Sequence, residues 1–445
     1  MFHINIHTFR KMENLALSAI PTTRTVYKLN DIQGFNDLMD ASLHVFIQEE
    51  QPKTLKVNKV TYKTNMNQEY KIIRYDKNVL TRDMILHHGL LRSVIVNSAN
   101  KVVSFSPPKS VPLDVFRAYF ENQELIQNIQ AEEFVEGTMM NVFWDETIGI
   151  NGTWEIATRN SVGGEISFYT TKNSTRFRTM FKEALEYCHL DLNDLSKHFC
   201  YSFVIQHPEN RIVCTFTKPA LYLVEVFEIV NTEDGTVNVF PLNLDFFKKE
   251  KSVFKNTTVR FPEIYGEWNT IQDVKDKYAS MNTDFEVMGV VLREKITNMR
   301  TKIRNPVYEH VKNLRGTDAK LQYKYLVLRK QDKIKEYLET FPTHKKIFST
   351  FRQQLHDFTN QLMKNYVDCY IRKEKTDIPQ EYKSHLYMIH RHYVDVLKPA
   401  GEYVNKTVVI KYINDLDSGS LLYSLNRPLL KRYKKMEMEK MECDL

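Results

Sequence analysis

The spacing of hydrophobic residues changes near residue 305 of this 445-residue chain. Before that point, short runs of hydrophobic and β-branched residues alternate with polar ones, a pattern that is typical of β-strands. The runs that predict strands are 71–75, 93–97, 139–144, 154–158, 201–206, 211–216 and 221–230. Together they indicate an α+β body in which antiparallel sheets carry flanking helices.

After Asn305-Pro306 the hydrophobic residues fall three or four positions apart, which predicts amphipathic α-helices. The first stripe consists of Phe348, Phe351, Leu355, Phe358, Leu362 and Tyr366, and the second of Tyr382, Leu386, Ile389, Tyr393 and Leu397. We expect these aromatic side chains to form the core of a helical domain, because helices of this kind bury their apolar stripes against each other.

These patterns divide the chain into three parts, in keeping with a length that exceeds the usual size of one domain. Residues 1–60 show no clear period, and we expect an N-terminal arm or cap there. Residues 61–305 form the predicted sheet body, and residues 306–445 form the predicted all-helical domain.

The net charge of +7 is unevenly distributed along the chain. Residues 300–445 contain 29 Lys and Arg against 18 Asp and Glu, so the rest of the chain totals about −4. A basic C-terminal third suits a polyanionic partner such as RNA, although lysine-rich helix faces in contact with water would give the same count. The tail residues Lys431, Arg432, Lys434 and Lys435 are open to both interpretations.

Several classes of protein are not expected from this sequence. Apolar runs such as 220–224 are interrupted by charges well before the roughly 18 residues that a membrane span needs, so no membrane partner is predicted. The short apolar run at 15–20 makes a poor signal peptide, which favours a cytoplasmic location. The five cysteines have no paired metal spacing, so we predict neither a structural zinc site nor any other metal site.

The stretch Glu133-Phe134-Val135-Glu136-Gly137-Thr138 has the form of an active-site motif without its nucleophile. In ATP-dependent nucleic-acid ligases and capping enzymes, this motif reads lysine, any residue, aspartate, glycine. Glu136 and Gly137 supply the acidic residue and the turn, and the strand-like run 139–144 follows. The lysine position is occupied by Phe134, which we expect to stand at the floor of a cleft between sheets.

Other segments match the same enzymes in order and spacing. They are 91–95 with Arg92, 106–110 with Lys109, 154–161 with Arg159, 208–213 (Pro-Glu-Asn-Arg-Ile-Val), and Lys302-Ile303-Arg304. Over roughly residues 70–315 the chain resembles the phage-type ATP-dependent RNA ligases, typified by the tRNA-repair ligase of T-even phages. It looks most like the ligase-related proteins of large nucleocytoplasmic DNA viruses.

The resemblance implies a ligase-type nucleotidyltransferase domain followed by a helical domain that contacts RNA. It implies ATP and Mg²⁺ as cofactors if the protein is active. The positions that it assigns to nucleotide binding are Arg92, Glu136, Gly137, Arg159, Lys302 and Arg304.

The sequence departs from the family at the positions that carry its chemistry. Besides Phe134, Val204 stands where the family has a glutamate, and Met288 replaces the glutamate before Gly289. A thioether is a poor ligand for Mg²⁺, which prefers oxygen. Glu286 would lie about 6–7 Å from residue 288 on the same face of a strand. The three apolar replacements could instead fill the former pocket as core.

These departures favour an RNA-ligase-like protein that is degenerate in catalysis and binds RNA, with nucleotide as a further ligand. The alternative is an active ATP-dependent RNA ligase in which Lys109, held on a stiff segment after two prolines, has become the nucleophile. A further alternative is a structural or scaffold protein of a virus. The expected partners are RNA and a viral nucleoprotein, in the host cytoplasm or the virion.

Overall fold

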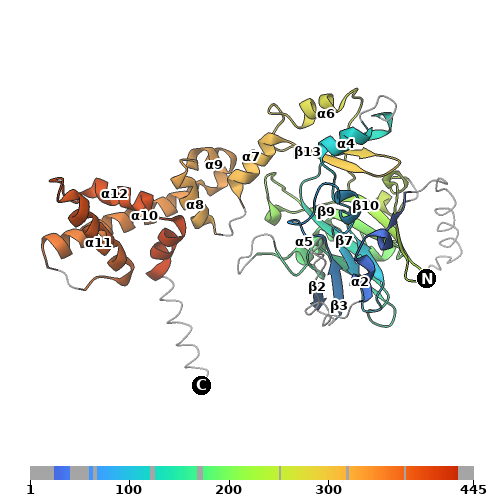
Figure 1. The fold of residues 1–445 in the computed structure, drawn as a ribbon, viewed down its shortest axis with the longest axis horizontal. Helices are drawn as coiled ribbons and strands as arrows, with labels where there is room; N and C mark the ends of the chain where they lie inside the picture. Colours follow the sequence, from blue (N-terminus) through green and yellow to red (C-terminus); the bar gives the residue numbers. More distant parts are fainter. Residues whose placement is uncertain are drawn as a thin grey trace, which may run out of the picture. The chain divides into compact units, whose positions relative to one another are not determined.

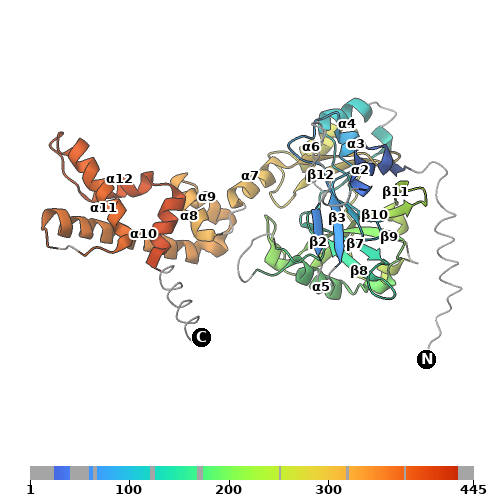
Figure 2. The same cartoon turned by 60° about the horizontal axis from the view of Figure 1, so that its bottom comes forward.

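The computed structural model describes residues 25–40, 60–63, 68–120, 126–167, 174–249, 252–316, 320–374 and 377–428. The chain forms two compact units, residues 1–313 and 314–445 (Figures 1 and 2). The described part of the first unit contains three antiparallel sheets with flanking helices, and that of the second is helical. The predicted α+β class with a helical C-terminal region is therefore confirmed.

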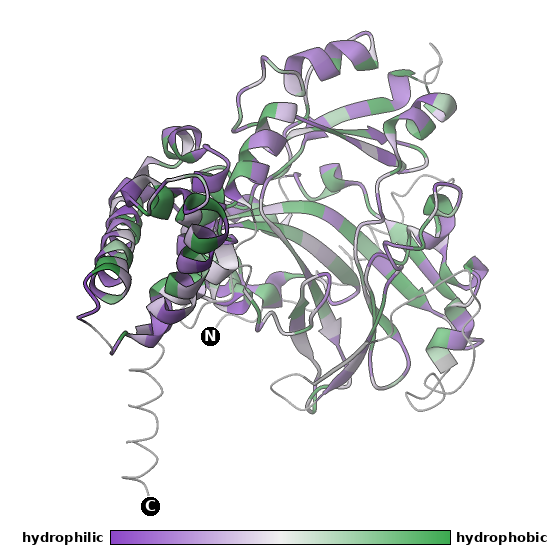
Figure 3. Cartoon of the chain, turned by 60° about the vertical axis from the view of Figure 1, so that its left-hand side comes forward, coloured by the Kyte–Doolittle hydropathy of each residue, from purple (hydrophilic) through white to green (hydrophobic). Residues whose placement is uncertain are grey.

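The largest sheet has six strands in the order β1-β11-β10-β9-β7-β8. Its strands are β1 (Tyr27–Lys28), β7 (Thr138–Asp145), β8 (Thr153–Ala157), β9 (Phe199–Gln206), β10 (Ala220–Asn231) and β11 (Val237–Pro241). Helix α5 (Phe177–Cys188) covers one face, where Phe181 and Ala184 pack against sheet residues such as Phe203. Figure 3 shows these strands as mostly hydrophobic, as expected for a sheet that is covered on both faces.

A four-stranded sheet packs against the other face of the six-stranded one. Its strands are β2 (Val60–Lys63), β3 (Glu69–Ile73), β4 (Val94–Val96) and β5 (Val102–Phe105). Phe105 packs edge-on against Phe227 of β10 with ring centroids 5.0 Å apart, so the two sheets share one core. Residues 25–40 join this core through Leu29 and Phe35, in η1 (Leu29–Asp31) and α2 (Phe35–Asp40).

The third sheet has three strands in the order β13-β12-β6. They are β6 (Ile129–Glu133), β12 (Gly289–Glu294) and β13 (Arg300–Arg304). One face is apolar and packs on α3 (Ile85–His88), α4 (Leu113–Phe120) and α6 (Ile271–Tyr278). The strand registers place Glu132, Val291 and Lys302 side by side on the opposite face, with Arg293 beside Arg300. That face is therefore strongly charged.

The helical unit confirms the two predicted stripes. Helix α7 (Pro306–Arg315) leads into this unit. The helices that follow are α8 (Leu321–Lys330), α9 (Ile334–Thr340), α10 (Lys345–Tyr366), α11 (Gln380–His392) and α12 (Lys406–Asp415), and residues 418–428 are also helical. Helices α10 and α11 end in π-helical turns, Val367–Ile371 and Tyr393–Leu397. Phe348, Phe358 and Leu362 are buried, so the stripe of α10 is core as predicted.

Short 3-10 helices connect several of these elements in the described residues. They are η3 (Ile126–Asn128), η4 (Leu192–Asp194), η5 (Pro208–Asn210), η6 (Leu244–Phe246), η7 (Val253–Asn256) and η8 (Pro342–His344). No helix in the described part of the chain is long and apolar enough to cross a membrane.

The predicted strand at 211–216 is wrong. These residues form an irregular loop after η5, because their backbone N–H groups bond to a side chain instead of a neighbouring strand. Val213 and Cys214 both donate to the carboxylate of Glu136, at 3.0 and 3.1 Å from its Oε1. Of the predicted N-terminal arm, residues 1–24 and 41–59 lie outside the described part of the chain.

Candidate functional site

Phe134 lies in the short connection between β6 and β7, where the chain passes from the three-stranded to the six-stranded sheet. Its ring is half-buried. The Lys302 Nζ lies 4.4 Å from the ring centroid and the Arg304 Cζ 5.5 Å from it. The ring therefore lies among cations, and it does not fill the former pocket as core.

Five cations from all three sheets lie close to one another, and one of them, Lys302, lies over this ring; we call the five the cationic cluster. They are Arg92 before β4, Lys109 after β5, Arg159 after β8, and Arg300 and Lys302 on β13. The cluster brings together four residues that the sequence analysis singled out. Arg300 was missed, although it lies two positions before Lys302 on the same face of a strand.

Burial and mutual repulsion lower the pKa values within the cluster. Burial lowers the pKa of Arg92 to about 10, with further lowering from Arg300 and Arg159. Burial holds the pKa of Lys302 well below its usual range, and Arg300 and Arg92 lower it further. The pKa of Lys109 is lowered by burial, then by Arg92 and Arg159. An anion would relieve this repulsion and restore these pKa values.

Backbone contacts hold the Lys109 segment between β13 and Arg92. The Arg300 Nη2 donates to the carbonyl oxygen of Pro108 at 2.7 Å, and the Val111 N–H donates to the carbonyl oxygen of Arg300 at 2.9 Å. The Lys109 N–H donates to the carbonyl oxygen of Gly89, three residues before Arg92, at 2.9 Å. The two prolines and these hydrogen bonds fix the backbone position of Lys109, and therefore the point from which its side chain extends.

Four members of the cluster have no carboxylate partner within the described residues. Arg92, Lys109 and Lys302 form no side-chain hydrogen bond or ion pair there, and Arg159 lies over the Tyr75 ring at 5.1 Å. The Arg159 Nε is buried without an acceptor in the same part of the chain. Charges buried without a partner are unfavourable, so this arrangement is suited to a bound anion.

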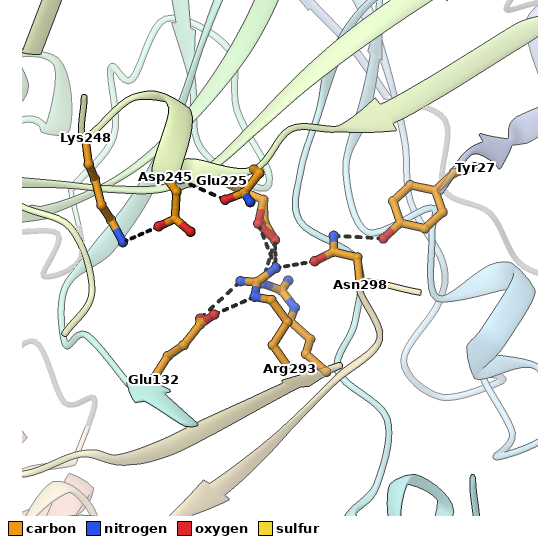
Figure 4. A network of polar contacts seen from close by, with 9 residues as sticks. Tyr27, Glu132, Glu225, Asp245, Lys248, Arg293 and Asn298 are labelled. Atoms are coloured by element: carbon orange, nitrogen blue, oxygen red, sulfur yellow. Dashed lines mark hydrogen bonds and ion pairs between the residues drawn. The ribbon is translucent and has the colours of Figure 1, made fainter. Parts of the chain in front are cut away.

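The nearby carboxylates are already occupied by arginines (Figure 4). Arg293 of β12 donates to Glu132 at 2.8 Å and to Glu225 of β10 at 3.1 Å. The Arg300 Nη1 lies 3.6 Å from Glu225. Asn298 accepts from Arg293 and donates to the Tyr27 hydroxyl at 3.0 Å. This network joins the six-stranded and three-stranded sheets beside the cluster and leaves Glu225 committed to two arginines.

Glu136 and Gly137 have structural roles at the start of β7. The buried Glu136 carboxylate accepts the N–H groups of Val213 and Cys214, so no contact joins it to the cluster within the described residues. A Cβ on Gly137 would overlap the carbonyl oxygen of Ile205, and its φ of 146° also favours glycine. Asn210 donates to the Thr138 hydroxyl at 2.8 Å, which fastens the Pro-Glu-Asn-Arg segment to the same strand.

The positions that would hold a divalent metal carry no carboxylate. Val204 is buried on β9, and Met288 is half-buried just before β12. The expectation that Glu286 shares a strand face with Met288 is wrong, because Glu286 is exposed in a turn and β12 begins only at Gly289. Within the described residues, no group of three or more His, Cys, Asp or Glu side chains could hold a metal ion.

Arg304 lies at the edge of the site. Its side chain is over the Phe134 ring, but its Nη1 also pairs with Glu309 at 2.6 Å. A hollow of about 640 Å³ elsewhere in the first unit is lined by other residues, among them Trp144, Trp154 and His189. None of the cluster's side chains lines that hollow, so the cluster is the candidate site on chemical grounds.

Comparison with known proteins agrees with the resemblance seen in the motifs. No family model matches the chain. An RNA ligase of Rhodothermus phage RM378 is 24% identical over 278 residues, which are 56% of this chain and 60% of the relative. The chain is RNA-ligase-like. It spans about 60% of the length of that curated relative. The solved structure of an archaeal ATP-dependent RNA ligase aligns with 80% of this chain. The alignment covers 82% of the archaeal chain, at 10% identity and a TM-score of 0.34.

Proposed function

We propose that this RNA-ligase-like protein binds RNA and holds a phosphate-bearing ligand on the cationic cluster, without the nucleotidyl transfer of active ligases. The observation that carries the proposal is the half-buried Phe134 ring beside Lys302, one of four neighbouring cations that lack a carboxylate partner in the described residues. Arginine and lysine side chains bind phosphate oxygens strongly when both groups are shielded from water.

The residues present fit the phosphates of ATP but not its metal. Arg92, Arg159 and Lys302 could contact phosphate oxygens directly. Mg²⁺ requires oxygen ligands in near-octahedral geometry, whereas the nearby carboxylate of Glu132 is held by Arg293 and that of Glu225 by Arg293 and Arg300. Phe134 has no lone pair with which to attack the α-phosphate.

A labelling and titration experiment tests this function. With α-labelled ATP and Mg²⁺, we expect no covalent adduct between AMP and the protein. Titration calorimetry should give weak ATP binding that is nearly unchanged when a chelator removes Mg²⁺, because the cations replace the metal. Arg92→Gln with Arg159→Gln should abolish this binding, whereas Arg82→Gln, an exposed arginine paired with Asp114, should not change it.

Other outcomes favour the alternatives. Tight ATP binding that collapses on chelation, or an adduct that maps to a lysine, would support the active ligase. The predicted nucleophile for that case is Lys109, whereas the amine over the Phe134 ring belongs to Lys302. A protein that binds neither ATP nor RNA would support the viral scaffold. We also propose RNA and a viral nucleoprotein as partners of this protein. Its proposed location is the host cytoplasm or the virion.

A further inference from the structure

We propose that Phe134 is a stacking platform for an unpaired base of single-stranded RNA, whose phosphates lie on the cationic cluster. This inference rests on the proposed RNA binding and adds the part of the RNA that the site recognises. It also gives the replaced nucleophile position a function of its own.

The position of the Phe134 ring suits stacking with a base and differs from that of a hydrophobic core residue. Phe134 is half-buried and belongs to no hydrophobic cluster of the described part of the first unit, whereas Val204 is buried. In the strand register Val290 lies opposite Glu133 and Gly289 lies opposite Arg304. Phe134 comes directly after this pairing ends, and the Arg304 Cζ lies 5.5 Å from its ring centroid.

The surroundings of the ring match the chemistry of single-stranded nucleic acid. Proteins that bind single strands combine aromatic faces, on which bases stack, with cations that follow the phosphates. Lys302 and Arg304 lie over the ring at 4.4 and 5.5 Å, Arg92 acts electrostatically on Lys302, and Lys109 and Arg159 act on Arg92 or on each other. A stacked base would take the place of the Lys302 amine over the ring. The flexible lysine stem lets that amine move to the phosphate of the same nucleotide.

The half-buried position also selects for an unpaired base. A base inside a duplex presents only its edge, because its faces are stacked on its neighbours. A base in a single strand, a loop or an end can turn its face toward an aromatic side chain. Because Lys302 belongs to the cluster and lies over the ring, one nucleotide could place its base on Phe134 and its phosphate on the cations.

The test uses the full chain and single-stranded RNA oligonucleotides that carry 2-aminopurine at the 5′ end, the centre or the 3′ end. Stacking on an aromatic ring quenches this fluorescent base. We expect quenching with at least one of the three probes. Phe134→Ala should abolish it and weaken RNA binding about tenfold or more, since base stacking on one aromatic side chain accounts for a change of that order. Phe134→Trp should retain both.

Two further variants separate stacking from folding and from general surface effects. Phe134→Leu keeps an apolar side chain of similar size but removes the ring face, so it should lose quenching while its melting temperature stays close to that of the wild type. Phe246 is 43% exposed, and the Lys249 Nζ lies 6.0 Å from its ring centroid, so it resembles Phe134 in kind. Phe246→Ala should leave RNA binding and quenching unchanged.

The outcomes distinguish this inference from the proposed function. If the wild type binds RNA but quenches none of the probes, or if Phe134→Leu quenches fully, the platform is ruled out and RNA binding stands. If the wild type fails to bind any of the oligonucleotides at about 50 mM salt, RNA binding itself is ruled out.

Discussion

A phenyl ring has no lone pair that could attack a phosphate, yet its face attracts cations. At position 134 the ring therefore keeps Lys302 and Arg304 close while it removes the covalent chemistry that a lysine would provide. The pKa of Lys302 lies well below its usual range, first because its amine is buried and then because Arg300 and Arg92 are close. Its charge is unfavourable in the absence of an anion, which makes it a sensitive reporter of the site.

Replacing Lys302 by methionine should stabilise the ligand-free protein at pH 7. The pKa of Lys302 lies well below its usual range in the folded chain, whereas an unfolded lysine titrates near about 10.4. The unfolded state thus binds more protons between these two values, so the wild type gains stability as pH rises through that window. The advantage of Lys302→Met should shrink over the same window.

Urea unfolding of the wild type and Lys302→Met across the pH range measures this difference. Lys295→Met, a replacement of a lysine on the loop after β12, controls for general effects of charge removal. A stabilisation by Lys302→Met that stays constant up to pH 10 would contradict the lowered pKa.

At the scale of elements, hydrophobic patterns predict the strands and helices that have an uninterrupted period. The runs at 201–206 and 221–230 form β9 and β10. The stripe at 348–366 lies on α10, and the stripe at 382–397 lies on α11 and the π-helical turn that follows α11. The run 211–216 has the same composition as a strand. It forms a loop because Glu136, more than 70 residues earlier in the chain, accepts its N–H groups. No local pattern carries that information.

Glu136→Ala should lower the free energy of unfolding by about 2 kcal/mol, because a buried and a partly buried N–H group lose their charged acceptor. Glu286→Ala is a matched control, since Glu286 is exposed in the adjacent turn and its side chain should contribute within about 0.5 kcal/mol. Chemical unfolding of both variants measures the difference. Equal stabilities would show that the loop does not depend on the Glu136 carboxylate.

At the scale of the whole molecule, the cationic cluster combines residues from segments that are up to about 200 positions apart in the sequence. The spacing of residues along the sequence does not predict that Arg92 and Lys302 lie close together in the fold. Only the resemblance to RNA ligases predicted that they share a site. Arg293 and Glu225 were missed, because they form an ion pair between strands of different sheets and neither residue lies in a motif. The long-range pairing of buried charges is decided by the fold and has no local signal.

We expect RNA affinity to come mainly from the basic residues after Pro306, with the cationic cluster holding one nucleotide. Counterion release makes the affinity for single strands fall with salt, with a slope of roughly 0.7 for each phosphate that a cation neutralises. Neutralising Lys431, Arg432, Lys434 and Lys435 together should flatten this slope if the tail, which lies outside the described residues, takes part. Arg92→Gln with Arg159→Gln should change it by roughly 0.7 to 1.4, which corresponds to one or two phosphates.

Affinity measured by fluorescence anisotropy between about 50 and 200 mM salt gives the slope for each variant. A slope that the tail variant leaves intact would exclude those four residues from the RNA contact. If the slope is also intact when Lys398, Lys406 and Lys411 of the described helical region are neutralised, these three lysines are likewise excluded from the RNA contact. The next residues to neutralise would then be the four cations of the cationic cluster that have no carboxylate partner in the described residues, because their charge is available to a phosphate of the RNA.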